Sequence, residues 1–152
     1  MARTTFTPME IAYLNTQILG RIATVDAGGA PRVVPTGFRY NPETGTIDLG
    51  GIDLAATRRF QDVRGNPRVA IVIDDLASTN PWRARSVRVR GIAEVFEQGG
   101  EQIRRGLGSA WMRVTPTAIS SSGLDESELL QPAGSSGVGS RSVHGSQEKR
   151  RR

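Results

Sequence analysis

The sequence contains no cysteine and a single histidine, and these two scarcities exclude much of common enzyme chemistry. Without cysteine there is no disulfide, no thiolate metal ligand and no thiol nucleophile. The one histidine, His144, lies in a Gly/Ser-rich terminal segment. A Ser-His-Asp triad, a histidine-ligated zinc and a histidine general base are therefore not expected in a folded site. If the protein is an enzyme, we expect a cofactor rather than a metal to carry the chemistry.

Long apolar runs are also missing. The longest uncharged apolar stretch is far shorter than the roughly 20 residues that a membrane helix needs. The N-terminal sequence MARTTFTPME lacks the apolar core of a secretion signal. We therefore expect a cytoplasmic protein with no membrane partner. The 152 residues are 37% hydrophobic and 23% charged, which is a globular composition and suits one ordinary domain.

The formal net charge of +5 is concentrated at one end of the chain. Residues 1–130 hold 15 arginines and 14 acidic residues, whereas residues 131–152 hold five cations and one acid. The body of the chain therefore has no basic footprint, and we expect no nucleic-acid partner. From about Leu130 the composition shifts to Gly, Ser, Gln and Arg, which cannot bury enough apolar surface to order a backbone. We predict a folded domain over residues 1–128 and a disordered basic tail over residues 129–152, for which a weak contact with polyanions is an alternative to a merely solvated end.

Two short helices are indicated. Thr7, Pro8 and Glu10 form a capping sequence, with proline at the first helical position and the acid three residues after the threonine. The second helical segment covers residues 53–63, with Asp53 as the candidate cap, and it ends at the sequence RGNP that follows. Each helix has an apolar face that can dock on a core.

Most of the remaining chain alternates between apolar and polar residues in the manner of strands. The segments with strand character are residues 18–25, 32–40, 46–51, 68–73, 86–96, 111–115 and 117–120. The run at 68–73 is continuously apolar after its first residue, as a strand buried on both faces would be, and residues 74–84 are predicted to form a loop. Six or seven strands joined by hairpins within about 120 residues predict a small closed antiparallel barrel.

The strongest candidate site is the sequence Thr57-Arg58-Arg59, near the start of the second helix. Two guanidinium groups and a hydroxyl beside the free N–H groups of a helix N-terminus make a good anion site. The planar fork of arginine suits a phosphate in particular. The alternative is that Arg58 and Arg59 are solvated helix charges that pair with Asp62.

A second candidate surrounds Pro35, which lies within a predicted strand although proline cannot donate a hydrogen bond to a neighbouring strand. We expect an edge position or a bulge at this point. The backbone of Val34, Pro35 and Thr36 would then be free to bind a planar heterocycle. An edge strand without a ligand is the alternative.

A third candidate is Pro81-Trp82, where the indole would cover a bound ring. The alternative is a tryptophan half-buried under a loop. The neighbouring carboxylates Asp74 and Asp75 are adjacent at a strand end, so they would point to opposite faces. We therefore do not expect them to act as an acid-base pair.

Three stretches of this chain, in the same order, resemble the pyridoxamine-phosphate-oxidase-like split barrels, and most closely the actinobacterial branch that uses the deazaflavin coenzyme F420. They are LGRIATVDAGGAPRVVPTGFRYNPETGTIDLGG, LAATRRFQDVRGNPRVAIVIDD and NPWRARSVRVRGIAEV, within a resemblance that covers residues 7–125. The resemblance implies a six-stranded antiparallel split barrel with two short helices, paired into a homodimer. It also implies a flavin or deazaflavin in each of two clefts between the subunits.

The resemblance implies roles for particular residues. Residues 57–59 match the Ser-Arg-Lys stretch that holds the cofactor phosphate, with Arg59 where lysine is commoner. Residues 34–36 match the strand whose backbone lines the ring system. Residues 85–87 are similar to an Arg-Gln-Val stretch beside the cofactor, with Ser86 in place of a longer amide, which weakens a specifically FMN-dependent interpretation. The full set of expected cofactor-binding residues is Val34, Pro35, Thr36, Gly51, Thr57, Arg58, Arg59, Pro81, Trp82, Ser86 and Val87.

The function implied by the resemblance is that of an oxidoreductase, which transfers a hydride between F420 and a small conjugated organic substrate. The protein would supply position, a dry cleft and electrostatics, and a proton would come from water or from Thr36. An FMN-binding flavoprotein with oxygen or a quinone as acceptor is one alternative, and a non-catalytic carrier of F420 or flavin is another. The sequence names neither the substrate nor the choice between F420 and FMN.

Overall fold

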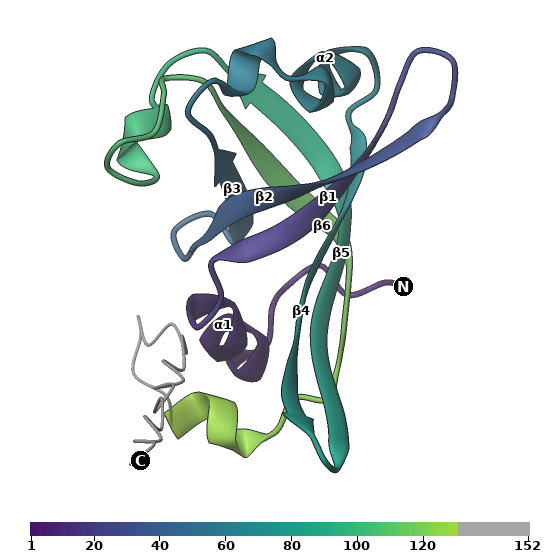
Figure 1. The fold of residues 1–152 in the computed structure, drawn as a ribbon, viewed down its shortest axis with the longest axis vertical. Coiled ribbons are helices and arrows are strands. Elements are labelled where there is room, and N and C mark those ends of the chain that lie inside the picture. The colour runs from purple at the N-terminus through teal and green to yellow at the C-terminus, as the bar shows by residue number, and fades with distance from the viewer. Residues whose placement is uncertain (131–152) are drawn as a thin grey trace, which may run out of the picture.

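Six antiparallel strands close into one barrel in the computed structural model, which describes residues 1–130 (Figure 1). The strands are β1 (Leu19–Val25), β2 (Pro31–Asn41), β3 (Thr46–Gly50), β4 (Arg68–Thr79), β5 (Trp82–Phe96) and β6 (Trp111–Ser122). The helices are α1 (Pro8–Asn15) and α2 (Arg58–Gly65), and the 3-10 turns are η1 (Leu54–Ala56), η2 (Gly100–Gln102) and η3 (Glu126–Leu130). Around the barrel the order is β1-β2-β3-β6-β5-β4, so the predicted antiparallel barrel is confirmed. The predicted tail lies outside the described residues, apart from its first two positions.

Helix α1 begins where the capping sequence predicts. The Thr7 hydroxyl accepts a hydrogen bond from the Glu10 amide at 3.2 Å, and the Glu10 carboxylate accepts one from the Thr7 amide at 2.9 Å. This reciprocal pair satisfies amides that the first turn would otherwise leave unpaired. The helix then buries Tyr13 and Leu14 in the core, and burying an aliphatic side chain of this size contributes about 1.5–3 kcal/mol.

The longest strand, β5, alternates as its sequence predicts. Val87, Val89 and Ala93 are buried in the barrel, while the intervening Arg88 and Arg90 are exposed on the outer face. Because side chains on a strand point alternately to its two faces, one strand supplies both core residues and a row of outward cations.

Two strand predictions are corrected by the structure. Residues 74–84 are not a loop: β4 and β5 continue as one long hairpin whose turn contains only Asn80 and Pro81. The hairpin extends past the barrel body (Figure 1). Its outer part packs against little of the core, so its sequence lacks the alternation of apolar and polar residues from which a strand is predicted. Nor is β4 buried on both faces, since Ile71 and Ile73 are buried but Val72 is half-exposed.

The second helix and the last strand also differ from prediction. Asp53 makes no side-chain cap, residues 54–56 form the turn η1, and Thr57 is the N-cap of α2. The last strand, β6, is one continuous element rather than two. A register shift accommodates Pro116, which lies opposite Gly91, and such a bulge is where a strand tolerates proline.

The position of Pro35 agrees with the expected edge. Residues 31–37 of β2 pair with β1 on one side, whereas β3 pairs with β2 only from Phe38 onward. The second side of residues 31–37 therefore has no strand neighbour within the described chain. No register shift interrupts the β1–β2 pairing, so Pro35 occupies an edge rather than a bulge.

Candidate cofactor site

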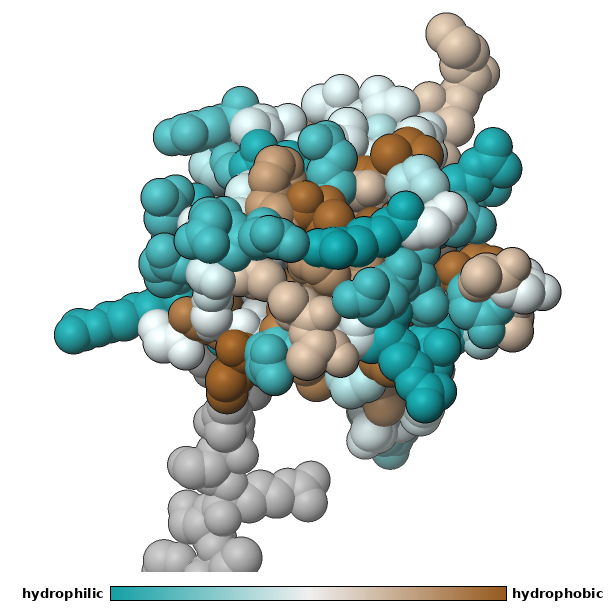
Figure 2. All heavy atoms as spheres, turned by 90° about the horizontal axis from the view of Figure 1, so that it is seen from above, coloured by the Kyte–Doolittle hydropathy of each residue, from teal (hydrophilic) through white to brown (hydrophobic). Residues whose placement is uncertain are grey.

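The N-terminus of α2 presents backbone N–H groups at one end of the barrel. The Thr57 hydroxyl accepts a hydrogen bond from the Phe60 amide at 3.4 Å and donates one to the Leu54 carbonyl at 2.7 Å, so it is committed to the helix cap. The amides of Arg58 and Arg59 have no hydrogen-bond partner among residues 1–130. First-turn amides of this kind favour an anion. Figure 2 views this end of the molecule, where hydrophilic residues surround small apolar areas.

The Arg59 side chain lies partly buried beside this helix end. Its Nε is buried without any hydrogen-bond partner in the described structure. Burial lowers the pKa of the guanidinium from its ordinary value, because a low-dielectric setting disfavours the charged form. A Cβ built on Gly51 would lie 3.7 Å from Arg59 Nη2, so the loop after β3 passes against this arginine. Gly51 and Arg59, both predicted to bind the cofactor, are therefore brought together.

The alternative assignment, an ion pair between these arginines and Asp62, is absent from the described structure. Asp62 is buried and accepts hydrogen bonds from the Thr24 hydroxyl at 2.7 Å and from Arg32 Nε at 2.9 Å. These two bonds, with the charges of Arg32 and Arg58, hold the pKa of Asp62 below its ordinary value. Arg58 is exposed, and together with Arg32 it lines a hollow of about 380 Å³. The lining of this hollow thus includes residues of both α2 and β2.

The edge of β2 supplies the second candidate group. Pro35 is exposed and Val34 is half-buried, while Thr36 is buried. The Thr36 hydroxyl donates to the Gly37 carbonyl at 3.1 Å, so its proton is engaged with the backbone. The free side of this strand leaves the backbone of residues 34–36 available to a planar ligand.

The third candidate group, Pro81 and Trp82, lies away from the arginines of α2. Pro81 and Trp82 occupy the tip of the β4–β5 hairpin, and Trp82 is 71% exposed rather than half-buried. In Figure 1 this tip and α2 lie at opposite ends of the molecule. Farther along β5, the Ser86 hydroxyl contacts the Ser122 hydroxyl at 3.0 Å, and the Val87 side chain is fully buried in the core. One chain alone therefore does not bring Pro81 and Trp82 to the arginines of α2.

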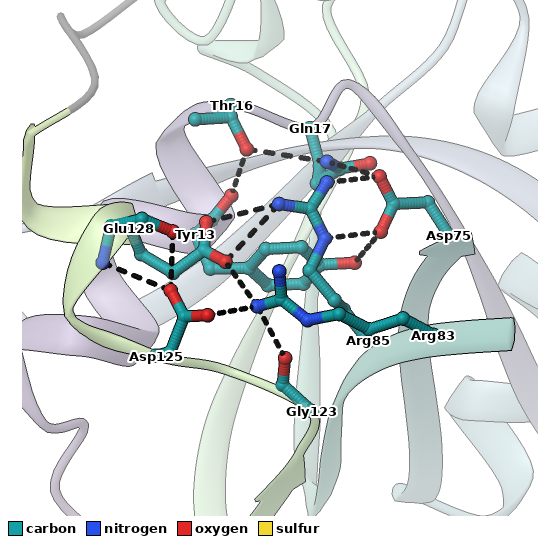
Figure 3. A network of polar contacts seen from close by, with 10 residues as sticks. Tyr13, Thr16, Gln17, Asp75, Arg83, Arg85, Gly123, Asp125 and Glu128 are labelled. Atoms are coloured by element: carbon teal, nitrogen blue, oxygen red, sulfur yellow. Dashed lines mark hydrogen bonds and ion pairs between the residues drawn. The ribbon is translucent and has the colours of Figure 1, made fainter. Parts of the chain in front are cut away.

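A polar cluster around Arg85, which the sequence did not predict, fixes the other end of the barrel (Figure 3). Arg85 Nε and Nη2 donate to the carboxylate of Asp75 at 2.8 and 2.5 Å, and Nη1 donates to both oxygens of Glu128 at 3.1 Å. Its guanidinium lies 5.1 Å from the centre of the Tyr13 ring, and the Tyr13 hydroxyl donates to Asp75 at 3.1 Å. The Arg85 cluster thus joins α1, the hairpin and η3.

Charges in the Arg85 cluster are strongly coupled. Burial acts to raise the pKa of Asp75, but the hydrogen bonds from Arg85, Tyr13 and Gln17 outweigh it, so the pKa lies below its ordinary value. Burial raises the pKa of Tyr13, and the nearby Asp75 carboxylate raises it further. These shifts describe a cluster in which the Asp75 carboxylate is ionised and paired with Arg85, while Tyr13 is neutral.

Comparison with known proteins places the chain in a family. The pyridoxamine 5'-phosphate oxidase family matches residues 9–129, and the chain belongs to it. A 5a,11a-dehydrotetracycline/5a,11a-dehydrooxytetracycline reductase from Streptomyces rimosus is 38% identical over 120 residues, which are 79% of this chain and 84% of that protein. Family membership together with this reductase shows that the chain is an oxidoreductase.

Solved structures confirm the split-barrel fold. A conserved hypothetical protein from Mycobacterium tuberculosis superposes with a TM-score of 0.60 at 19% identity, over 87% of this chain and 94% of that chain. An FAD-binding protein from Mycobacterium smegmatis superposes with a TM-score of 0.57 at 24% identity, over 78% and 96% of the two chains. Among residues 1–130, no helix has the length and apolar character needed to cross a membrane.

Proposed function

We propose that this protein is an F420-dependent reductase, which transfers a hydride between the deazaflavin coenzyme and a small conjugated organic substrate. The observation that carries the proposal is the buried Nε of Arg59, which has no partner among residues 1–130 and lies beside the open amides of the α2 N-terminus. A buried N–H without a hydrogen-bond partner is costly, and a phosphate at this place would satisfy it.

The residues present fit a phosphate-bearing redox coenzyme. Arg59 and the first amides of α2 would hold the phosphate, with exposed Arg58 adding charge and the loop at Gly51 lying against the guanidinium. The free backbone edge of residues 34–36 would position the ring system. When bound, the reduced coenzyme supplies the hydride. Because the Thr36 hydroxyl is buried and donates to a backbone carbonyl, we assign the accompanying proton to water.

A homodimer would complete the site. Pro81, Trp82 and Ser86 lie along the β5 hairpin, away from α2 in the same chain. A second copy related by a two-fold axis would bring its hairpin against the first copy's α2 end, and the reverse contact would form the second site. Such an arrangement gives the exposed Trp82 indole a place over the cofactor ring.

The reductase relative supports a proposal for the substrate class. That protein's name describes a polycyclic dehydro compound, so reduction of a conjugated carbon–carbon double bond is the reaction proposed here. The hydride would add to one alkene carbon, and the proton to the other carbon after charge has moved onto the conjugated oxygen.

An FMN-dependent enzyme is the second candidate, and the FAD-binding protein among the structural neighbours supports a flavin as the cofactor class. Fluorescence titration of the purified apoprotein with F420 and, separately, with FMN distinguishes the two. We expect micromolar or tighter binding of F420 and weaker binding of FMN. Preference for FMN would move the protein to the flavin-dependent reaction, and binding of neither coenzyme would contradict the proposal. Binding of F420 with no turnover across a panel of conjugated acceptors would indicate a carrier.

The same titration tests the phosphate site. Arg59→Ala should weaken F420 binding by about tenfold or more, because a charge-assisted hydrogen bond contributes about 1.5–3 kcal/mol. Arg64→Ala is the matched control, since Arg64 lies on the same helix but is paired with Glu97 at the surface. Equal affinities of wild type and Arg59→Ala would remove this site from the proposal.

A further inference from the structure

Asp62 connects the two parts of the proposed cofactor site, the start of α2 and the edge of β2. It is buried on α2, one helical turn after Arg58 and Arg59. Its Oδ2 accepts a hydrogen bond from the Thr24 hydroxyl at 2.7 Å and a second from Arg32 Nε at 2.9 Å. Thr24 and Arg32 lie directly opposite each other in the β1–β2 pairing. One carboxylate oxygen of the helix is therefore held by one cross-strand pair of the sheet.

These two bonds fix the place of β2 relative to the start of α2. Arg32, Val34 and Thr36 lie on the same face of β2, because side chains two apart on a strand point the same way. No register shift interrupts the β1–β2 pairing over this stretch. On the other side of the contact, the first amides of α2 are about one turn, or about 5.4 Å along the helix axis, from Asp62. Both parts of the site thus lie a short stretch of regular backbone away from the same carboxylate.

The other contacts of α2 do not fix this separation. Phe60 and Val63 are buried in the core, but apolar contacts of this kind are not directional. Arg64 pairs with Glu97, which follows β5. Within residues 1–130, the two bonds to Asp62 are the only hydrogen bonds that join α2 to β1 or β2.

The surface beside Asp62 is open. The hollow of about 380 Å³ described above lies between α2 and the β1–β2 turn, and its lining includes Asp26 and Ala27 of the turn and Gln61 of the helix. Close packing therefore does not hold the helix to the turn on this side. The directional bonds of the Asp62 carboxylate do so instead.

We propose that Asp62 is a positioning residue, which holds the phosphate-binding start of α2 at a fixed distance from the ring-binding edge of β2. The inference rests on the proposed function, because it concerns a coenzyme that occupies both places at once. When a phosphate and a ring are covalently joined, the second contact adds affinity only if the two places are at the separation that the joining chain spans. A separation fixed before binding also reduces the cost of ordering the protein. Because a carboxylate repels a phosphate, Asp62 acts through Thr24 and Arg32 and not as a ligand.

The test compares two ligands that differ in the phosphate arm. F420 carries the ring and the phosphate, whereas 8-hydroxy-5-deazariboflavin carries the same ring and ribityl chain without the phosphate. Fluorescence titration of the full-length protein with each ligand gives the ratio of the two affinities, which measures what the phosphate adds. Asp62→Ala should bind deazariboflavin as wild type does, while its F420 affinity should fall by about tenfold.

Inorganic phosphate distinguishes a misplaced phosphate site from a lost one. In 15N-labelled protein, titration with inorganic phosphate should shift the Arg59 Nε–Hε resonance with the same midpoint in wild type and in Asp62→Ala. The conservative variant Asp62→Asn keeps a side-chain oxygen that can accept from Thr24 and Arg32, and it should restore most of the F420 affinity. A residue that only stabilised the fold would not separate the three ligands in this way.

Two further variants complete the series. Thr24→Val keeps the size of the buried side chain and removes one of the two donors to Asp62. It should lower the F420 affinity several-fold without changing that of deazariboflavin, and it decides the question if Asp62→Ala does not fold. Arg64→Ala is the matched control, since Arg64 lies on the same helix but pairs with Glu97, and it should leave both affinities unchanged.

The outcomes separate this inference from the proposed function. An unchanged affinity ratio in folded Asp62→Ala, or an equal loss for both ligands, would overturn the positioning role and leave the phosphate site of Arg59 in place. Wild-type protein that binds F420 no more tightly than deazariboflavin would overturn the phosphate site and the positioning role together. If the protein prefers FMN, the pair FMN and riboflavin takes the place of the two deazaflavins, with the same expected ratios.

Discussion

The two ends of the barrel each contain a partly buried arginine, and the two arginines are in opposite situations. Arg85, 13% exposed, is bonded to Asp75 and Glu128 and lies against Tyr13. Arg59 has a buried Nε with no partner among residues 1–130, and burial lowers the pKa of its guanidinium. A guanidinium that the chain itself satisfies stabilises the fold, whereas one that the chain leaves unsatisfied is open to an external anion.

The largest effect is expected from Arg85→Met. This variant leaves the partly buried Asp75 without its cation, and the fully buried Glu128 keeps only the 3.9 Å contact with Arg83. Breaking a buried ion pair in this way costs about 3–5 kcal/mol. Urea unfolding should show the loss as a lower midpoint. Arg64→Met is the matched control: it breaks the exposed pair with Glu97 and should cost less than about 1 kcal/mol. Similar losses of unfolding free energy in the two variants would show that the Arg85 cluster stabilises the fold no more than a surface ion pair does.

Unlike Arg85→Met, Arg59→Ala should weaken coenzyme binding without destabilising the fold. Its free energy of unfolding without coenzyme should be unchanged or slightly raised, because the variant removes a half-buried side chain whose buried Nε has no partner among residues 1–130. Its F420 affinity should nevertheless fall, by the amount given above. Urea unfolding with and without saturating coenzyme measures both quantities on the same protein. A destabilisation as large as that of Arg85→Met would show that Arg59 is a structural residue as well.

Part of the dependence of stability on pH should come from the Arg85 cluster. The pKa of Asp75 in the folded chain lies below its ordinary value of 3.8, and the pKa of Glu10 lies below its ordinary value of 4.5. The unfolded chain therefore binds more protons, and the free energy of unfolding should decrease as the pH falls from about 5 through these folded pKa values. Unfolding curves between pH 7 and pH 3 check this. The Asp75→Asn variant should show a shallower decrease, and an unchanged slope would contradict the assignment to Asp75.

The smallest effect is expected from Trp82→Ala. Since the indole is 71% exposed at the hairpin tip, its removal should leave the unfolding free energy within about 0.5 kcal/mol of wild type. If a second copy places this indole over the cofactor ring, F420 affinity should fall several-fold. Unchanged coenzyme affinity would place the hairpin tip outside the site and argue against the proposed dimer arrangement.

Local signals in the sequence predicted most of the fold. The Thr7 capping box, the edge position of Pro35 and the alternation of β5 each depend on residues close together in the chain, and each is found in the structure. The hairpin between β4 and β5 was missed because Asp74, Asp75 and the Asn80-Pro81 pair are typical of loops. In the structure, the two carboxylates are instead neutralised by arginines from other strands.

The candidate site could be predicted only in part. The sequence indicated Arg58 and Arg59 but placed the helix start at Asp53, because that residue is also a common cap; the turn η1 intervenes, and Thr57 takes this role. The Arg85 cluster could not be predicted, since Tyr13 and Glu128 lie 62 residues before and 43 residues after the residues they contact. Only the closed barrel brings them together.

One measurement compares the two arginines directly. In 15N-labelled protein, the Nε–Hε resonances of Arg59 and Arg85, assigned through Arg59→Lys and Arg85→Lys, can be followed during titration with F420. We predict that the Arg59 resonance shifts on binding, as its Nε gains an anionic partner, while the Arg85 resonance stays in place. An Arg59 resonance that does not move while the coenzyme binds would contradict the proposal that this guanidinium holds the cofactor phosphate.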